Sequence, residues 1–238
     1  MVTISEIDTK RFGIKVAKVY LEESSEISTV FQNALALSTE LLILRCSTQH
    51  INLAQQLEEN GCFICDTLLY YKKSLTKIPL VFSSPEFEVI PCNFADVDEI
   101  RDVATAAFAN YMGHYHADSR LSSDSSNEVY VDWAMNRTKE LPFFGVRLKK
   151  QGSIIGFISG QLDKEASEVD VPLLAIAPEF QGRGIFTQLI TEMENWALQN
   201  SYKTIIYSTQ LQNVSVQKSL ARNGFELQKS LYTFHRWF

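Results

Sequence analysis

The sequence predicts an α/β (α+β) fold in which helices flank a mixed, mostly antiparallel central sheet. Runs rich in β-branched and aromatic residues alternate with segments whose apolar residues recur at helical spacing. In the second half, three strands in succession indicate antiparallel pairing, and a later strand–helix–strand stretch indicates one parallel pair. A segment with Pro79 and two adjacent serines indicates a linker, so we expect domains at residues 1–84 and 85–238.

The first half is expected to be a smaller α/β domain. Its predicted strands are residues 14–20, 41–44 and 62–71, and its predicted helices are residues 27–37 and 51–59. The second helix stops at Asn60-Gly61, and a similar Asn223-Gly224 stop occurs late in the second half. The first half therefore resembles a degenerate copy of the second.

The second half carries more elements. Its predicted strands are residues 87–90, 143–148, 153–161, 169–177, 204–208 and 225–234, and its predicted helices are residues 95–110, 127–136, 183–199 and 214–223. A long loop is expected at residues 111–126, and loops of that length are often functional. Pro172 falls inside a predicted strand and cannot donate a ladder hydrogen bond, so one side of that strand should be incompletely paired.

Composition and charge exclude several classes of protein. The net charge of −6 gives no support for nucleic-acid binding, which usually requires a basic face. No run of about 18 apolar residues predicts a membrane span, and no leader is evident, so we expect a cytoplasmic protein. The four cysteines are too few for a disulfide scaffold. Cys62 and Cys65 form a C-x-x-C at the start of a predicted strand, and we interpret them as structural.

A glycine turn, Gln181-Gly182-Arg183-Gly184, separates a strand from an amphipathic helix. Unpaired N–H groups at a helix start favour negative charge, and glycines let an anion approach the backbone closely. Arg183 adds a cation. The turn therefore fits a diphosphate, although an ordinary strand-to-helix turn has the same spacing. Thr187 stands where the dinucleotide-binding fingerprint has its third glycine, so that fingerprint is absent.

Two motifs in this order resemble the GNAT acetyltransferases. Leu174-x-Ile176-x-Pro178 followed by Gln181-x-x-Gly184 looks like their motif A, and the segment from Asn213 to Phe225 is similar to a second family motif. The resemblance implies the GNAT fold, acetyl-CoA as co-substrate and no metal. It also implies a set of cofactor-binding residues along the strand, the turn and the second motif. These are Leu174, Ile176, Gln181, Gly182, Arg183, Gly184, Ile185, Phe186 and Asn213.

The chain departs from the family pattern at two positions. Phe186 replaces the second small residue of motif A, where the backbone amide can still bind. Leu220 occupies the position where the family often has a tyrosine that protonates the departing thiolate. Leucine cannot donate a proton, so water, Ser219 or Tyr207 are the open alternatives.

Candidate catalytic groups lie on the strand before the turn and in the long loop. Asp170 leads into motif A, and Glu168 should share its face of the strand. The loop from Tyr111 to Asp118 holds His114 and His116, and histidine titrates near working pH. Metal binding, chance surface placement and substrate recognition are the alternatives for this loop. No third ligand cluster is evident, so we expect no metal and interpret the loop as a substrate site.

A narrower resemblance suggests the acceptor. The segments Arg11-Phe12-Gly13-Ile14, Tyr115-His116-Ala117-Asp118 and Thr209-Gln210-x-x-Asn213 look like the dTDP-fucosamine N-acetyltransferases. These enzymes acetylate the 4-amino group of a nucleotide-linked 4-amino-4,6-dideoxyhexose for surface polysaccharides. The resemblance implies that Thr209, Gln210 and Asn213 lie near the acceptor and the acetyl group. The predicted substrate-binding residues are Tyr115, His116, Asp118, Thr209 and Gln210, and the predicted catalytic residues are His116, His114, Asp170 and Asn213.

Two other functions stay open. The acceptor could be a peptide N-terminus, a polyamine or an antibiotic, or the chain could bind acyl-CoA without catalysis, which Leu220 favours. The last predicted strand is followed by Trp237 and Phe238 and could extend the sheet of a second copy, so a homodimer is a further expectation.

Overall fold

The computed structural model describes residues 1–76 and 84–238 and contains one ten-stranded sheet in the order β1-β2-β3-β10-β4-β9-β8-β7-β6-β5. The strands are β1 (Thr3–Ile4), β2 (Val16–Leu21), β3 (Leu41–Ser47), β4 (Phe63–Ser74), β5 (Phe87–Pro91), β6 (Phe143–Leu148), β7 (Ile154–Asp163), β8 (Glu168–Ile176), β9 (Thr204–Gln210) and β10 (Glu226–Trp237). The helices are α1 (Glu6–Phe12), α2 (Ile27–Ala36), α3 (Ile51–Glu59), α4 (Val97–Phe108), α5 (Ser123–Arg137), α6 (Ile185–Gln199) and α7 (Val214–Arg222). This mixed sheet with flanking helices confirms the predicted fold class.

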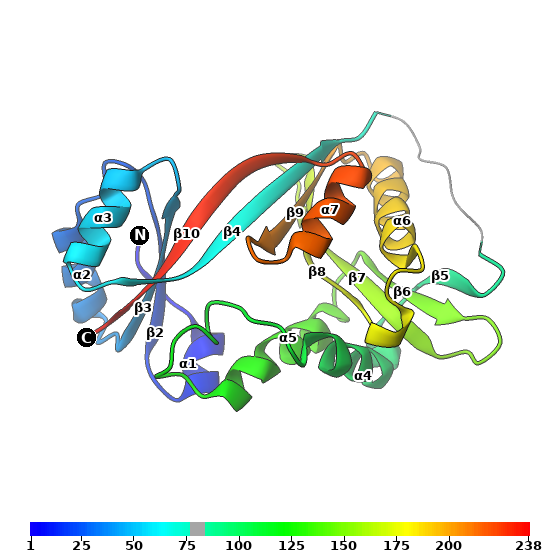
Figure 1. Ribbon diagram of the computed structural model, residues 1–238, viewed down its shortest axis with the longest axis horizontal. Coiled ribbons are helices and arrows are strands. Elements are labelled where there is room, and N and C mark those ends of the chain that lie inside the picture. The colour runs from blue at the N-terminus through cyan, green and yellow to red at the C-terminus, as the bar shows by residue number, and fades with distance from the viewer. Residues whose placement is uncertain (77–83) are drawn as a thin grey trace.

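The last strand of the chain lies inside the first half of the sheet. β10 pairs antiparallel with β3 on one side and with β4 on the other. Figure 1 shows β10 and β4 running side by side from the α2–α3 end of the molecule to the α7 end. We expected a linker at residues 72–84, but residues 72–74 continue strand β4, and residues 77–83 lie outside the described residues. The domain division after residue 84 stays a prediction.

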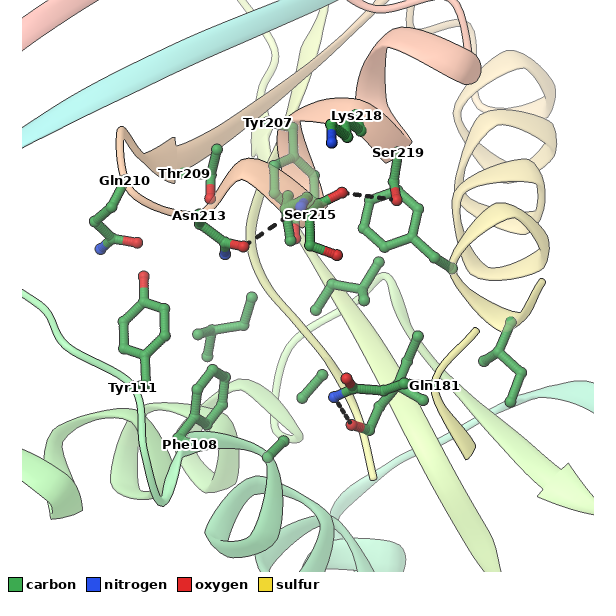
Figure 2. A pocket seen from close by; sticks show the side chains of 18 of the residues that line it. Phe108, Tyr111, Gln181, Tyr207, Thr209, Gln210, Asn213, Ser215, Lys218 and Ser219 are labelled. Atoms are coloured by element: carbon green, nitrogen blue, oxygen red, sulfur yellow. Dashed lines mark hydrogen bonds between the residues drawn. The ribbon is translucent and has the colours of Figure 1, made fainter. Parts of the chain in front are cut away.

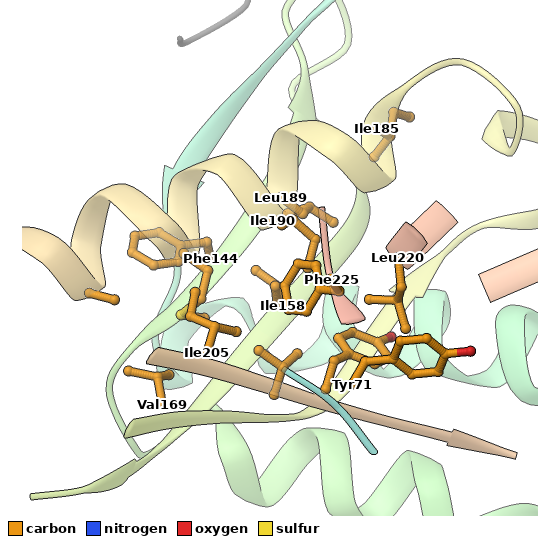
Figure 3. Packing of buried hydrophobic residues seen from close by; sticks show 14 of the residues in the cluster. Tyr71, Phe144, Ile158, Val169, Ile185, Leu189, Ile190, Ile205, Leu220 and Phe225 are labelled. Carbon is orange, nitrogen blue, oxygen red and sulfur yellow. The ribbon is translucent and has the colours of Figure 1, made fainter. Parts of the chain in front are cut away.

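Three apolar clusters hold the helices on the sheet. One lies under α2 and α3, with Leu44, Leu57 and Phe234 almost fully buried. The second joins α4 and α5 to their side of the sheet, and the third lies under α6 and α7. In Figure 3, Leu189 and Ile190 of α6 pack against the sheet. Burying apolar surface contributes about 25 cal/mol per Å², so these clusters are the main source of stability.

The parallel pair β8–β9 parts halfway along its length. The pairing runs from Glu168–Thr204 to Val171–Tyr207 and stops there, although both strands continue. The next residue of β8 is Pro172, which has no N–H to donate. On its other side β8 stays paired with β7. The expected parallel pair and the expected incomplete pairing at Pro172 are both confirmed.

Two elements near the N-terminus, β1 and α1, were not predicted from the sequence. Each is short, and α1 carries only two apolar residues, so neither has a clear periodic pattern. Helix α5 begins at Ser123, four residues before the predicted start, and Ser122 caps it by accepting from the Ser125 N–H at 3.4 Å. Because α4 ends at Phe108, before its predicted end at residue 110, the loop covers residues 109–122 in place of the predicted 111–126. Among the described residues, no helix is long and apolar enough to span a bilayer.

Candidate functional site

A cavity of about 830 Å³ opens where β8 and β9 part. Its walls come from β8, the turn before α6, the end of β9, α7 and the loop that follows α4. Figure 2 shows Gln181 at one end of this cavity, and Tyr111 with Gln210 at the other. The parted strands therefore leave a long cleft with a helix start at one end and an aromatic, polar surface at the other.

The glycine turn leaves a row of backbone N–H groups without partners. Gly182 and Gly184 have φ of 76° and 79°, values that favour glycine, and a Cβ at either position would meet nothing within 4 Å. The N–H groups of residues 182–187 have no acceptor among the described residues. Helix α6 begins at Ile185 without a side-chain cap. These groups fit an anion such as a diphosphate.

The cations that line the cavity differ from the expected one. Arg183 does not line the cavity, because its Nη2 donates to the Glu179 carbonyl at 3.2 Å and its guanidinium stacks on Phe180. Lys218 and Arg222 of α7 line it instead. The sequence signal for them is a polar stripe at spacings of three and four along α7, which consists of Ser215, Lys218, Ser219 and Arg222.

Most of the predicted cofactor residues lie together in this cavity. Every member of the set except Arg183 lines the cavity, as do the predicted acceptor residues Thr209 and Gln210. The Gln181 amide donates to the Ile176 carbonyl at 3.1 Å, which braces the turn against β8. Asn213 accepts from the Val216 N–H at 3.4 Å and so caps α7. No ligand contact tests these assignments, and they continue as proposals below.

Leu220 is fully buried in the apolar cluster under α6 and does not line the cavity. Of the two alternative donors, the Ser219 hydroxyl bonds the Ser215 carbonyl at 3.0 Å. Tyr207 lines the cavity at the last paired position before the strands part. Burial raises the pKa of Tyr207, so its phenol stays protonated at neutral pH.

The histidine-rich loop is held by buried hydrogen bonds. His114 Nδ1 lies 2.9 Å from His235 Nε2, and His235 Nδ1 lies 2.7 Å from Asp118 Oδ2. Burial lowers the pKa of His114, so this ring is neutral. Burial raises the pKa of Asp118, but hydrogen bonds from His235 and Trp237 outweigh that effect and leave the pKa below its usual value. These contacts tie the loop to β10.

The remaining residues of this loop divide between the cavity and other contacts. The Tyr115 hydroxyl donates to Asp8 at 3.0 Å, and the ring nitrogens of His116 lie near Gly113 N and Asn127 Oδ1 at 3.2 and 3.0 Å. The cavity lining includes Tyr111 and Met112 of the loop, but not His114, Tyr115, His116 or Asp118. The catalytic and substrate-binding roles of those four residues stay predictions, and their observed contacts are structural.

Asp170 lies just before the point where the strands part. It is paired across the sheet with Gln161 and Ile206, and its Oδ1 is buried without a partner among the described residues. Burial raises the pKa of Asp170 to about 6, and the Val171 N–H and Arg137 oppose that rise. Glu168 on the same face is neutralised by Lys72 at 2.6 Å. Asp170 does not itself line the cavity, but Pro172, two residues on, does.

The cysteines are free thiols, and three of them are buried. Burial raises the pKa values of Cys62 and Cys65 to about 12, which makes both thiols unreactive at neutral pH. In the described part of the chain, no group of three or more His, Cys, Asp or Glu side chains is placed to hold a metal ion.

Comparison with known proteins assigns the family. The family model described as "Acetyltransferase (GNAT) family" matches residues 103–225, slightly more than half of the chain. The chain belongs to the GNAT acetyltransferase family. It is a GNAT-type N-acetyltransferase, and GNAT enzymes use acetyl-CoA as the acyl donor. The matched range contains the glycine turn, both parted strands and α7.

Individual proteins that the chain resembles share at most about a quarter of their residues with it. The chain is 26% identical over 204 residues to the spore coat polysaccharide biosynthesis protein SpsD of Bacillus subtilis (strain 168), covering 84% of this chain and 67% of that protein. The GCN5-related N-acetyltransferase from Sphaerobacter thermophilus matches 99% of this chain and 76% of its own with a TM-score of 0.69 and 11% identity. A tandem GNAT protein from the clavulanic acid biosynthesis pathway matches 93% and 75% with a TM-score of 0.65 and 10% identity. These structures share the fold.

Gly184→Glu should abolish acetyl-CoA binding measured by calorimetry, because it places a carboxylate beside the unpaired N–H groups. Gly152→Glu is a matched control, since Gly152 has a φ of 76° and open space around its Cβ position in the β6–β7 turn. Both variants add the same charge and the same backbone strain. Equal affinity in the two variants, with the fold intact, would show that the turn does not hold the cofactor.

Proposed function

We propose that this GNAT enzyme transfers the acetyl group of acetyl-CoA to the 4-amino group of a nucleotide-linked 4-amino-4,6-dideoxyhexose, such as a dTDP-amino sugar. The observation that carries this proposal is the cavity. One end is a helix start with unpaired N–H groups, and the other, which we call the inner end, has two phenols and two polar side chains, Tyr111, Tyr130, Thr209 and Gln210. Aromatic walls with a few placed polar groups suit a sugar ring. The name of the relative SpsD, a spore coat polysaccharide biosynthesis protein, supports a sugar acceptor.

We place the cofactor along the parted strands. The N–H groups of residues 182–187 would hold its diphosphate, and Lys218 and Arg222 would add positive charge. Its pantetheine arm would lie along β8 at Leu174 and Ile176, where β9 leaves room. Acetyl-CoA supplies an activated acyl group as a thioester. The cavity then directs that group toward Tyr207 and the inner end.

Attack on a thioester requires a neutral amine, so a base has to remove a proton. Asp170 is suited to that role, because a carboxylate with a pKa of about 6 is ionised at neutral pH and still basic enough to accept a proton. Since Asp170 lies just outside the cavity lining, we propose that it acts through water. The Asp170 charge also favours a protonated amine entering the cleft.

The departing thiolate requires a proton, and we propose Tyr207 as its donor. Tyr207 stands where the strands part, lines the cavity and remains protonated because burial raises its pKa. Ser219 is the weaker candidate, since its proton is engaged with the Ser215 carbonyl. The enzyme would act as a cytoplasmic protein, which fits its free, unreactive thiols.

Thiol release in the presence of acetyl-CoA should be fastest with a dTDP-linked 4-amino-4,6-dideoxyhexose. The comparison set is a peptide N-terminus, spermidine and an aminoglycoside. Faster release with any of these would move the acceptor to another amine. Tight CoA binding without turnover of any amine would support the non-catalytic alternative that the buried Leu220 raises.

Asp170→Asn should lower kcat about 100-fold and remove the rise of kcat through about pH 6, because only the ionised carboxylate accepts a proton. The unfolding free energy at pH 8 should not fall, since the variant removes a buried charge. Glu168→Gln is the control on the same strand face and should keep the pH profile. Identical profiles for Asp170→Asn and the wild type would remove Asp170 from the mechanism.

Tyr207→Phe should lower kcat by about tenfold to 100-fold while leaving the KM values nearly unchanged, because the phenol acts on the leaving group rather than in binding. Ser219→Ala distinguishes the two donors and should retain the wild-type rate. A loss of rate in Ser219→Ala with none in Tyr207→Phe would reverse the assignment. Steady-state kinetics with both substrates varied provides the measurement.

A further inference from the structure

Four polar side chains form a row on one face of the sheet beyond the inner end of the cavity. Thr233 of β10 is in register with Arg45 of β3 on one side and with Asp66 of β4 on the other. Two residues after Asp66, Leu68 pairs with Gln210 of β9. Paired residues, and residues two apart on one strand, point to the same face. We call Arg45, Thr233, Asp66 and Gln210 the polar row.

The polar row contains three of the ten buried side-chain polar atoms that have no partner among the described residues. Arg45 Nε, Thr233 Oγ1 and Gln210 Oε1 are all buried and have no hydrogen-bond partner among the described residues. Thr233 is fully buried, and Gln210 is 7% exposed. Buried polar atoms are nearly always bonded, and each one left unpaired costs about 1 to 3 kcal/mol. A polar group from outside the chain, either ordered water or a ligand, would satisfy these three atoms.

The charged members of the row are also incompletely paired. Arg45 forms no ion pair with any described residue. Burial raises the pKa of Tyr70, and the positive charge of Arg45 opposes that rise. Asp66 Oδ1 accepts from the Thr67 N–H at 2.7 Å. Burial raises the pKa of Asp66 to about 6, and the Thr67 N–H and Arg45 oppose that rise. At neutral pH the row therefore presents a cationic donor and an anionic acceptor.

The polar row adjoins the cavity through three of the cavity's own residues. Gln210 belongs to both, and Tyr111 and Tyr130 line the cavity. Burial raises the pKa values of both tyrosines, and the negative charge of Asp66 raises them further. Figure 2 shows the Tyr111 hydroxyl pointing toward Gln210. The unpaired atoms of Arg45 and Thr233 are buried and do not line the cavity, so a ligand would reach them only after a side chain at the cavity wall, such as that of Gln210, moved.

We infer that Arg45 and Asp66 bind ring hydroxyl groups of the acceptor, so that the first half of the chain supplies the sugar-recognition part of the site. This inference rests on the proposed function and assigns its substrate class to named residues. A hydroxyl both donates and accepts, so neighbouring hydroxyls match an arginine fork beside a carboxylate. A polyamine offers only cationic donors, and Arg45 would repel it. A hydroxyl-free amine would leave the row unsatisfied.

The test compares acceptors in Arg45→Gln, Asp66→Asn and a control. Arg236→Gln is the matched control, because Arg236 is also half-buried with an unpaired Nε, but it stacks on Phe31 and Phe238 on the opposite face of the sheet. The acceptors are a dTDP-linked 4-amino-4,6-dideoxyhexose, the methyl glycoside of the same sugar and cyclohexylamine. The methyl glycoside separates hydroxyl recognition from recognition of the nucleotide diphosphate.

Each polar-row variant should raise the KM for both sugars about tenfold, as expected for loss of a hydrogen bond to a charged group. The KM for acetyl-CoA and the rate with cyclohexylamine should stay within about twofold of the wild type. Arg236→Gln should match the wild type for all acceptors. Asp66→Asn keeps the side-chain volume, and it decides the result alone if Arg45→Gln does not fold.

The outcomes separate this inference from the proposed function. Wild-type acetylation of the sugar with unchanged KM in both variants would overturn the polar-row assignment and keep the function. An increase confined to the nucleotide-linked sugar would assign the row to the diphosphate and also overturn it. If the wild type does not acetylate the sugar, calorimetry with CoA-bound protein decides. If the wild type binds the sugar and the variants do not, the polar-row assignment stands and the proposed reaction is overturned. If the wild type does not bind the sugar, both are overturned.

Discussion

The separation of β8 from β9 after Val171 and Tyr207 is the constraint on which the site depends. A parallel pair would normally continue, because unpaired backbone groups inside a protein are unfavourable. Here Pro172 removes one donor, and β7 keeps the far edge of β8 in place, so only one edge opens. The glycine turn and α7 then border the opening on either side. The same break thus creates the cleft and presents backbone groups that a ligand can satisfy.

Local chemistry explains which parts of the fold could be predicted. Gly182 and Gly184 permit a left-handed backbone, and Pro172 lacks a donor. Each signal is local, so the turn, the helix start and the incomplete pairing were visible in the sequence. The insertion of β10 between β3 and β4 could not be seen, because the pairing joins residues far apart in the chain. Strand order carries no periodic signal.

The roles of side chains were also predictable where they depend on neighbouring residues in the sequence, and not where they depend on distant ones. His114 was expected from loop composition to be catalytic, but its ring bonds His235, 121 residues away, and no local pattern reveals that partner. Asp66 was passed over because a single carboxylate within an apolar strand has no spacing to mark it. Lys218 was overlooked, although the polar residues of α7 recur at helical spacing in the sequence. Distant pairing therefore decided which polar residues face the cleft.

Asp66 and Asp170 both reduce the stability of the folded chain at neutral pH. Each carboxyl has a pKa of about 6, raised from 3.8, and one unit corresponds to about 1.4 kcal/mol. Ionisation in the folded state is therefore unfavourable by on the order of 2 to 3 kcal/mol per group. Because the folded-state pKa values are raised, the protonated carboxyls do not reduce the unfolding free energy below about pH 4. The unfolding free energy falls as the pH rises through 6 and the two groups ionise. Such strain is typical of residues kept for function.

The position of β10 also has a consequence for how the chain acquires its structure. Every other strand precedes β10, so during synthesis β3 and β4 are made long before the strand that separates them. Until then their edges are open and able to pair with other chains. Closing contacts of such long range is slow, because the loop entropy is lost before the pairing compensates for it. The nascent chain should therefore depend on chaperones or fast elongation until β10 emerges.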